Sequence, residues 1–371
     1  MEQAETPSPA APARAAPFST VRRVDWPDMS APRVHGEIGD KPPEAGDPND
    51  DTGALAGACG GAVVTGGAWV TFRYVIVVAG ESLIDLVPDG AAGPLSPLLP
   101  RPGGGPYNTA VALGRIGAEA AFCSRVSTDA FGEALLGGLR AAGVATGLVQ
   151  RGPEPTSLAV ASVGPDGSAR YGFYVEGTAD RLFVLPERLP EGVRAVAFGT
   201  CSLALEPGAS AYEELLRRSS REGVFTLLDP NVRPGLIPDP AAYRDRFAGW
   251  LPYVSLLKLS EEDAAWLGGS PAGLLERGPG AVVLTRGAGG LTVFTRGFEV
   301  SVPAVRVRVV DTIGAGDTVN AALLHGLAGR DPAALSREEW RELLSLAARA
   351  AALTCTRAGA EPPYGHELGD G

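Results

Sequence analysis

The stretch DTIGAGD, residues Asp311–Asp317, places two acidic residues and a turn of small residues directly before an amphipathic segment. Apolar residues recur at helical spacing over 317–328, which predicts a helix with one face in a core. The turn Gly314–Gly316 should therefore lie at a helix N-terminus, where free backbone N–H groups and the helix dipole favour an anion such as a phosphate. Glycine also lets the backbone approach that anion closely. The stretch predicts a site for phosphoryl transfer.

Asp317 admits two interpretations in this position. Aspartate is one of the preferred N-cap residues of helices, and a capping aspartate needs no role in chemistry. Alternatively, Asp317 accepts the proton of a substrate hydroxyl, while the amides of Gly314, Ala315 and Gly316 form an anion hole for the phosphoryl oxygens. Other motifs of the chain decide between the two.

Two further motifs lie near the start of the globular region. The segment VVAGESLID at residues 77–85 ends on Asp85, and GGGPYN at residues 103–108 joins three glycines to an asparagine. With the 311–317 stretch, they resemble the first strand and sugar-contacting aspartate, the Gly-Gly-x-x-x-Asn substrate motif and the C-terminal signature of the ribokinase-like carbohydrate kinases, also called the PfkB family. This combination is highly specific, and the resemblance extends over about 74–366.

Strand and helix signals alternate from Tyr74 onward, which favours an α/β fold with helices on both faces of a doubly wound sheet. Short apolar runs predict strands at 75–79, 120–124, 193–198, 224–229, 254–258, 281–285 and 291–295. Helical spacing predicts helices at 108–116, 130–142, 210–221, 240–249, 261–267, 317–328 and 338–353. Ligands then belong at the carboxyl ends of the strands. The resemblance implies the same architecture, a ribokinase-like three-layer α/β/α sheet with a small β lid.

The resemblance places a kinase domain over residues 74–371, with lid segments at about 86–102 and 156–178. A Pro-Asp-Gly turn signal between two apolar runs predicts a hairpin in the second segment. This hairpin either excludes water from the site on closing or is a surface hairpin without a gating role. Residues 1–73, rich in Ala, Pro and Gly, are predicted to form a disordered extension. The apolar run 53–70 has an acidic flank and begins too far from Met1 for a signal peptide, so we do not interpret it as a membrane span.

The resemblance assigns substrate contacts to seven residues: Asp85, Gly104, Gly105, Asn108, Tyr174, Asn231 and Arg233. A carboxylate can accept hydrogen bonds from two hydroxyls, an amide both donates and accepts, and paired glycines permit close backbone approach. Arg233, the last residue of a DPNVR segment, offers a fixed fork of donors to phosphoryl charge. The alternatives are a turn aspartate at Asp85, a hinge at residues 103–105 and a surface salt bridge at Arg233.

The resemblance assigns nucleotide contacts to four residues: Lys258, Ser260, Thr285 and Gly287. It also implies that Asp263 contacts Mg²⁺ through water and that Asp311 supports a cation near the phosphates. A serine followed three residues later by an acid, as in Ser260 and Asp263, is equally a capping-box signature, and residues 285–290 are also typical of a plain β-turn. The sequence has no G-x-x-x-x-G-K-[ST] P-loop, so the phosphates must be held in another way.

Composition restricts the function further. The chain has 371 residues, of which 45% are apolar and 20% charged, as in ordinary soluble globular proteins. Its net charge of −11 argues against a nucleic-acid or anionic-membrane binder. The four cysteines form no C-x-x-C pair and only three histidines are present, which favours neither a disulfide framework nor a zinc site. A metal should then be a hard ion such as Mg²⁺ that arrives with the nucleotide.

The resemblance implies a cytoplasmic kinase that transfers the γ-phosphate of ATP to a hydroxyl of a neutral sugar, with Mg²⁺ and a monovalent cation such as K⁺, and it raises the prospect of a homodimer. Val175 stands where keto-acid kinases commonly have an arginine, so a substrate carboxylate would lack its partner and fructose is favoured. Ribose, nucleoside and 2-keto-3-deoxygluconate kinases are alternatives, and a non-catalytic sugar sensor is an alternative of another class. A dinucleotide-binding oxidoreductase is not favoured, because no G-x-G-x-x-G follows the first strand.

Overall fold

The computed structural model describes residues 64–65, 68–69, 75–89, 95–163, 169–327 and 329–369. Strands β1 (Val64–Thr65) and β2 (Ala68–Trp69) pair as a short antiparallel ladder. The predictions for the rest of residues 1–73, including disorder and the apolar run, lie outside the described residues. Within the described ranges, no helix has both the length and the apolar character needed to cross a membrane.

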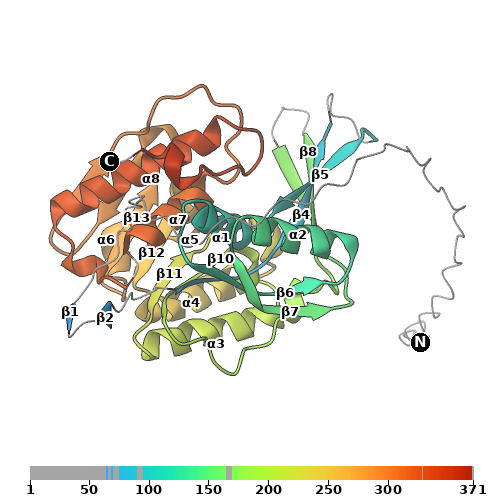
Figure 1. Ribbon diagram of the computed structural model, residues 1–371, viewed down its shortest axis with the longest axis horizontal. Helices are drawn as coiled ribbons and strands as arrows, with labels where there is room; N and C mark the ends of the chain where they lie inside the picture. The colour runs from blue at the N-terminus through green and yellow to red at the C-terminus, as the bar shows by residue number, and fades with distance from the viewer. Residues whose placement is uncertain are drawn as a thin grey trace, which may run out of the picture. The chain divides into compact units, whose positions relative to one another are not determined.

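A nine-stranded sheet forms the centre of the domain (Figure 1). Its strands, in spatial order, are β15 (Glu299–Val302), β14 (Leu291–Phe294), β13 (Ala281–Thr285), β12 (Leu256–Ser260), β11 (Phe225–Asp229), β10 (Val193–Gly199), β3 (Val75–Ala79), β6 (Ala120–Ser127) and β7 (Ala145–Gly152). Strand β14 pairs antiparallel with both of its neighbours, and all other pairs are parallel. The predicted α/β class is confirmed.

Eight α-helices accompany the sheet in the described residues: α1 (Gly105–Arg115), α2 (Ala130–Ala141), α3 (Gly208–Arg221), α4 (Pro240–Trp250), α5 (Glu261–Leu267), α6 (Pro271–Leu275), α7 (Ala315–Leu327) and α8 (Arg337–Cys355). Local capping fixes several starts. Asp129 accepts a hydrogen bond of 2.7 Å from the N–H of Gly132 at the start of α2, and Ser336 and Glu339 form a capping box before α8. Each predicted strand and helix is present, with its ends shifted by at most three residues.

Alternation along the parallel strands separates two hydrophobic cores. In β3, Ile76 and Val78 face one core and Val77 and Ala79 face the other. The first core also contains apolar residues of α1, α2, α7 and α8, and the second contains those of α3, α4, α5 and α6. Because successive side chains of a strand point to opposite faces, one buried strand serves both cores. The result is the predicted three-layer α/β/α arrangement.

A second, four-stranded sheet has the spatial order β5 (Leu98–Gly103), β4 (Leu83–Pro88), β8 (Leu158–Val163) and β9 (Ala169–Tyr174). Strands β4 and β8 pair in parallel, and the two outer pairs are antiparallel. Figure 1 shows β4, β5 and β8 together, away from helix α8. The Pro- and Gly-rich segment 86–102 contributes strand residues at both of its ends, whereas the turn between β8 and β9 lies outside the described residues.

Strand β3 marks the topological switch point of the large sheet. It lies between β6, which is the next strand of this sheet along the chain, and β10, from which the sheet continues to β11 and β12. In doubly wound sheets, ligands bind beyond the carboxyl ends of the strands at such a point. The segments that leave this edge are the ones that the sequence motifs occupy, including Asp229 at the end of β11 and Ser260 at the end of β12.

Candidate active site

A cavity of about 260 Å³ at this edge is lined by residues of both sheets. The small sheet contributes Leu83, Asp85, Ala159, Tyr171 and Phe173. The large sheet and its helices contribute segments that follow β3, β10 and β11, Lys258 of β12, the start of α1 and the first turn of α7 with the residues before it. A ligand in this cavity would therefore touch both sheets at once.

Asp317 is the third residue of α7, so it is not the N-cap and the capping interpretation is wrong. Its Oδ2 atom accepts a hydrogen bond of 2.9 Å from Nδ2 of Asn108, and the residue lines the cavity while remaining only 8% exposed. Burial raises the pKa of Asp317 to about 6, although the Asn108 hydrogen bond and the positive charge of Lys258 lower it. At neutral pH the carboxylate is ionised and is a stronger base than an exposed aspartate.

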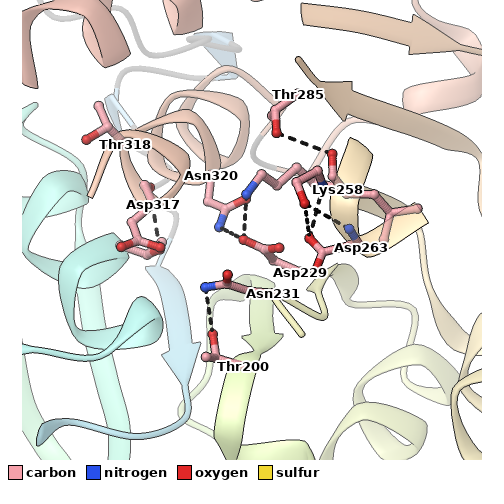
Figure 2. A network of polar contacts seen from close by, with 12 residues as sticks. Thr200, Asp229, Asn231, Lys258, Asp263, Thr285, Asp317, Thr318 and Asn320 are labelled. Atoms are coloured by element: carbon pink, nitrogen blue, oxygen red, sulfur yellow. Dashed lines mark hydrogen bonds and ion pairs between the residues drawn. The ribbon is translucent and has the colours of Figure 1, made fainter. Parts of the chain in front are cut away.

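Gly105 lies where three polar side chains meet. A Cβ atom on Gly105 would be 2.6 Å from Oγ1 of Thr200 and 3.3 Å from both Nδ2 of Asn231 and Oδ1 of Asp317, so a larger residue would disturb all three. Thr200 and Asn231 have left-handed backbone conformations, with φ of 58° and 38°, and Asn231 donates a hydrogen bond to Thr200 (Figure 2). Strained backbone of this kind concentrates at functional sites.

Asp85, on β4 of the small sheet, and Arg233, in the segment after β11 of the large sheet, line the same cavity. Asp85 lies within β4 rather than in a turn, so the turn interpretation is wrong. Burial raises the pKa of Asp85 to about 6, while the charge of Arg233 lowers it. Arg233 is exposed, and its Nη1 atom donates to the side-chain oxygen of Asn231 at 2.6 Å. The pair offers a sugar both an acceptor carboxylate and a guanidinium.

Figure 2 shows a network in which Asp229 joins two elements. Its Oδ2 atom accepts hydrogen bonds of 2.7 Å from Nζ of Lys258, on β12, and of 2.7 Å from Nδ2 of Asn320, on α7. All three residues are buried, and Lys258 also lines the cavity. Burial lowers the pKa of Lys258, but the charge and hydrogen bond of Asp229, together with the charges of Asp317 and Asp263, outweigh burial and the pKa is raised. The ammonium group therefore remains charged.

Ser260 and Asp263 form a capping box at the start of α5. Oγ of Ser260 accepts from the N–H of Asp263 at 3.0 Å, and Oδ2 of Asp263 accepts from the N–H of Ser260 at 3.0 Å. Oδ1 of Asp263 accepts a further bond of 2.7 Å from the N–H of Val232. The capping interpretation is confirmed, and both carboxylate oxygens are already engaged. A water-mediated contact with Mg²⁺ stays a prediction.

Asp311 organises the turn that precedes α7. Its Oδ1 atom accepts from the N–H groups of Thr312 and Ile313 at 2.7 and 3.1 Å, and its Oδ2 atom accepts from Gly359 at 2.8 Å. A direct structural role is thus present, and the predicted support of a cation remains a prediction.

Two of the three predicted anion-hole residues, Gly314 and Gly316, line the cavity. Gly314 has a φ of 79°, and a Cβ atom there would lie 2.7 Å from Cβ of Ala360, so both conformation and space require glycine. Ala315 is not among the lining residues, and its N–H donates to the carbonyl of Thr312 at 3.3 Å. The turn approaches the cavity through its glycines.

Six of the seven predicted substrate residues line the cavity, namely Asp85, Gly104, Gly105, Asn108, Asn231 and Arg233. Tyr174 does not, and it is 65% exposed. Tyr171 and Phe173 of the same strand line the cavity instead. Alternate residues of a strand face opposite sides, so Tyr174 and its neighbour Phe173 cannot both point inward.

The predicted nucleotide residues are arranged along the neighbouring strand ends. Lys258 lines the cavity, whereas Ser260 and Thr285 are paired residues at the ends of β12 and β13. Gly287 begins the short 3₁₀ turn that follows β13. Ser260, Thr285 and Gly287 do not line the cavity of about 260 Å³. They lie at the same carboxyl edge of the large sheet, at the ends of β12 and β13.

Sequence reasoning missed several residues of the site. Thr200 and Asp229 stand at the ends of β10 and β11, a position that itself signals a ligand edge. Asn320 follows Asp317 by three positions on α7, and that spacing places two side chains on one helix face. Glu81 also lines the cavity, and burial raises its pKa to about 7. No comparable spacing signal marks Glu81.

The arrangement brings together the groups that phosphoryl transfer to an alcohol requires. A buried carboxylate can accept the hydroxyl proton, Asp85 can accept hydrogen bonds from other hydroxyls, and the Gly314–Gly316 turn and Lys258 can face the charged oxygens. Positioning and electrostatics account for most of the catalysis in such reactions.

Comparison with known proteins leads to the same class of enzyme. Residues 76–365 match the family described as pfkB family carbohydrate kinase. A fructokinase of Rhizobium leguminosarum bv. trifolii is 38% identical over 262 residues, which cover 68% of this chain and 79% of the relative.

Solved structures show the same likeness. A fructokinase from Xylella fastidiosa with bound ATP superposes with a TM-score of 0.72 at 30% identity, covering 79% of this chain and 96% of that structure. A fructokinase double mutant from Vibrio cholerae, with fructose, ADP and potassium ion bound, gives a TM-score of 0.68 at 26% identity and covers 78% of this chain and 94% of that structure. The chain therefore belongs to the pfkB family of carbohydrate kinases.

Proposed function

We propose that this carbohydrate kinase transfers the γ-phosphate of ATP to a hydroxyl of fructose. The observation that carries the proposal is the position of Asp317, a buried carboxylate held by Asn108 in the cavity that also exposes Gly316 and Lys258. Its similarity to fructokinases, including solved structures with ATP or with fructose and ADP bound, supports both substrates.

Fructose would be held by the residues that line the cavity from both sheets. The Asp85 carboxylate lines the cavity, where it can accept hydrogen bonds from sugar hydroxyls. Phe173 and Tyr171 offer apolar surface to the sugar ring. Val175 is buried and leaves no cation at that position for a substrate carboxylate, which favours a neutral sugar over a keto acid.

The donor set at the other end of the cavity fits a polyphosphate. It consists of the backbone N–H groups of the α7 turn, at the positive end of the helix dipole, and of the Lys258 ammonium, and the Arg233 guanidinium beside Asp85 adds a further charged donor to the cavity. Bound there, ATP supplies the phosphoryl group. The described residues contain no group of three or more His, Cys, Asp or Glu side chains that could hold a metal, so Mg²⁺ would enter on the phosphate oxygens. Asp263, through water, and Asp311, beside a cation such as K⁺, are the proposed protein contacts.

In the reaction, Asp317 accepts the proton of the attacking hydroxyl as the sugar oxygen bonds to the γ-phosphorus. The bond between that phosphorus and the bridging oxygen of ATP breaks, and ADP leaves. Asn108 holds the carboxylate of Asp317 in place, and the N–H groups of the α7 turn face the phosphoryl oxygens. General-base assistance alone is worth roughly 10²- to 10⁴-fold.

The test is ADP release from the full chain with ATP·Mg²⁺ and a panel of fructose, ribose, 2-keto-3-deoxygluconate, adenosine and fructose phosphates. We expect turnover of fructose, and a loss of at least about 100-fold in kcat for Asp317→Asn with fructose binding retained. Preference for another panel member would overturn fructose but keep the kinase. Near-normal turnover by Asp317→Asn would refute the base assignment.

A further inference from the structure

The polar network behind the cavity has a role that the substrate contacts do not explain. Asp229 is 3% exposed and does not line the main cavity, yet its Oδ2 atom binds both Lys258 and Asn320 at 2.7 Å. Resting on the proposed function, we infer that Lys258 supplies a fixed positive charge to the phosphoryl group in transfer, and that Asp229 is the positioning residue that holds Lys258 there.

The Lys258 ammonium lies beside the first turn of α7. A Cβ atom on Gly316 would lie 3.0 Å from Nζ of Lys258, so the ammonium rests against the first turn of α7, one residue before Asp317. Lys258 also lines the cavity. The positive end of the helix dipole and a full positive charge therefore meet at the same point, where the phosphoryl oxygens are expected.

Lys258 has more than one carboxylate with which it could pair. Its ammonium faces the charges of Asp229, Asp317 and Asp263, and Asp229 is the strongest of them. A buried ammonium must pair with a carboxylate, and without Asp229 the strongest remaining carboxylate charge on Lys258 is that of Asp317. Pairing with Lys258 would tie up the proposed base. Asp229 therefore prevents an ion pair between Lys258 and Asp317, and Asp317 stays available as the base.

Asn320 makes the arrangement rigid. It lies three residues after Asp317 on α7, so the two side chains leave the same face of one helix. Its donation to Asp229 ties the end of β11 to that helix, and Lys258 ties the same carboxylate to β12. Figure 2 shows the three side chains converging from three elements. One carboxylate thus fixes the ammonium relative to the base.

The inference predicts opposite shifts in the pH profile. Asp317 faces Lys258, which lowers its pKa, Asp229, which raises it, Arg233, which lowers it, and the neutral donor Asn108. Lys258→Met should therefore move the acid limb of kcat against pH upward, and Asp229→Asn should move it downward. Damage to packing alone would not give shifts of opposite sign.

The test measures kcat, fructose KM and the pH profile for wild type, Lys258→Met, Asp229→Asn and the double variant. We expect kcat to fall about 100-fold for Lys258→Met and about 10-fold or more for Asp229→Asn, with fructose KM within about 3-fold. In the Lys258→Met background, Asp229→Asn should cost nothing further in kcat at pH values above the acid limb, because its effect on turnover there acts through Lys258, whereas its direct effect on the pKa of Asp317 shifts only the limb. The double variant leaves neither Lys258 nor Asp229 as an unpaired buried charge. If Lys258→Met does not fold, the double variant is used to measure the loss of kcat without the ammonium.

Thr226→Val is the matched control for damage to β11. Thr226 is fully buried on that strand and donates to the carbonyl of Tyr253 at 2.6 Å, away from the cavity. It should lower the melting temperature and leave kcat and the pH profile unchanged. A Lys258→Met kcat within about 3-fold of wild type, limb shifts of the same sign, or an equal cost of Asp229→Asn in both backgrounds would overturn the inference.

The two proposals fail in different ways. Wild-type activity on fructose together with any of those three results overturns the inference and leaves the function standing. Wild-type activity on another sugar of the panel overturns fructose alone, and the variants are then compared on that sugar. Wild-type protein that phosphorylates no sugar overturns both.

Discussion

Two carboxylates that line the cavity, Asp85 and Asp317, both have a pKa raised to about 6, chiefly by burial. Asp317 must be ionised to accept a proton, and Asp85 accepts hydrogen bonds best when ionised. Both requirements fail as the pH falls through 6. We therefore expect log kcat/KM for fructose to decline below about pH 6 with a limiting slope that approaches two.

The same measurement on Asp85→Asn separates the two groups. This variant should bind fructose more weakly and show a slope near one, with a limb that still lies close to the pKa of Asp317. A wild-type profile that stays flat down to pH 5 would contradict both assignments.

The ionised base also has a cost in stability. The pKa of Asp317 rises from 3.8 to about 6 on folding, so the folded state binds the proton more tightly than the unfolded state. Stability from this group is fully present below pH 3.8 and is lost as the pH rises through 6. Two pKa units correspond to about 3 kcal/mol above pH 7, as an upper bound.

We therefore expect Asp317→Asn to melt on the order of 5 °C higher than wild type at pH 7.5, with a gap that narrows toward pH 5. Thermal unfolding of both proteins across this range checks the prediction. A gap of constant size, or a less stable variant at pH 7.5, would show that the charge of Asp317 is not the cause.

At the scale of elements, Asp263 at the start of α5 has a capping role and a proposed contact with Mg²⁺, and experiments can separate the two. Asp263 caps this helix and binds the N–H of Val232, in the loop that also presents Asn231 and Arg233. We expect Asp263→Ala to lower the free energy of unfolding by about 1–3 kcal/mol, because a cap and a buried hydrogen bond are lost. Fructose KM should rise as the loop loosens.

The Mg²⁺ dependence of Asp263→Ala then decides the metal role. If Asp263 acts only as a cap, the Mg²⁺ concentration at half-maximal activity stays at the wild-type value. An increase of about tenfold, with stability unchanged, would assign the residue to the metal. Ser336→Ala, at the capping box of α8 and away from the cavity, is the matched control for loss of a cap alone.

Elements were predictable where one local rule decides them. The strands β3 and β13 are short apolar runs that are buried on both faces, so their position follows from the sequence alone. The face of β9 was not predictable, because its pattern does not say which side meets the cavity, and Tyr174 was chosen where Phe173 lines it. The network around Asp229 joins residues 91 positions apart and depends on tertiary packing.

At the scale of the whole molecule, an acidic protein holds a site built for anions. The net charge is −11, yet Lys258, Arg233 and the N-terminus of α7 converge on one cavity. Local charge in a recessed site outweighs distant charge, which salt screens beyond about 8–10 Å. The acidic surface therefore does not oppose phosphate binding at the carboxyl edge of the sheet.

The cavity also couples the two sheets. Asp85 and Phe173 belong to the small sheet, and Asn231 and Lys258 to segments of the large one. The small sheet has four strands and exposes β5 almost entirely, so it has little core of its own and should open more easily than the large sheet. A bound sugar that contacts both sheets should stabilise the small one by linkage.

Hydrogen exchange tests this coupling. Saturating fructose with ADP should slow amide exchange in β4, β8 and β9 by about tenfold or more, as RT ln(1 + [L]/Kd) is added to the opening free energy. Helix α8, which has no residue in the cavity, should exchange at an unchanged rate. In Asp85→Asn, the protection by fructose should be lost, whereas ADP alone should protect the edge near β12. Equal protection of α8 and the small sheet would indicate general stabilisation, and no protection of the small sheet at saturation would rule out a ligand bridging the two sheets.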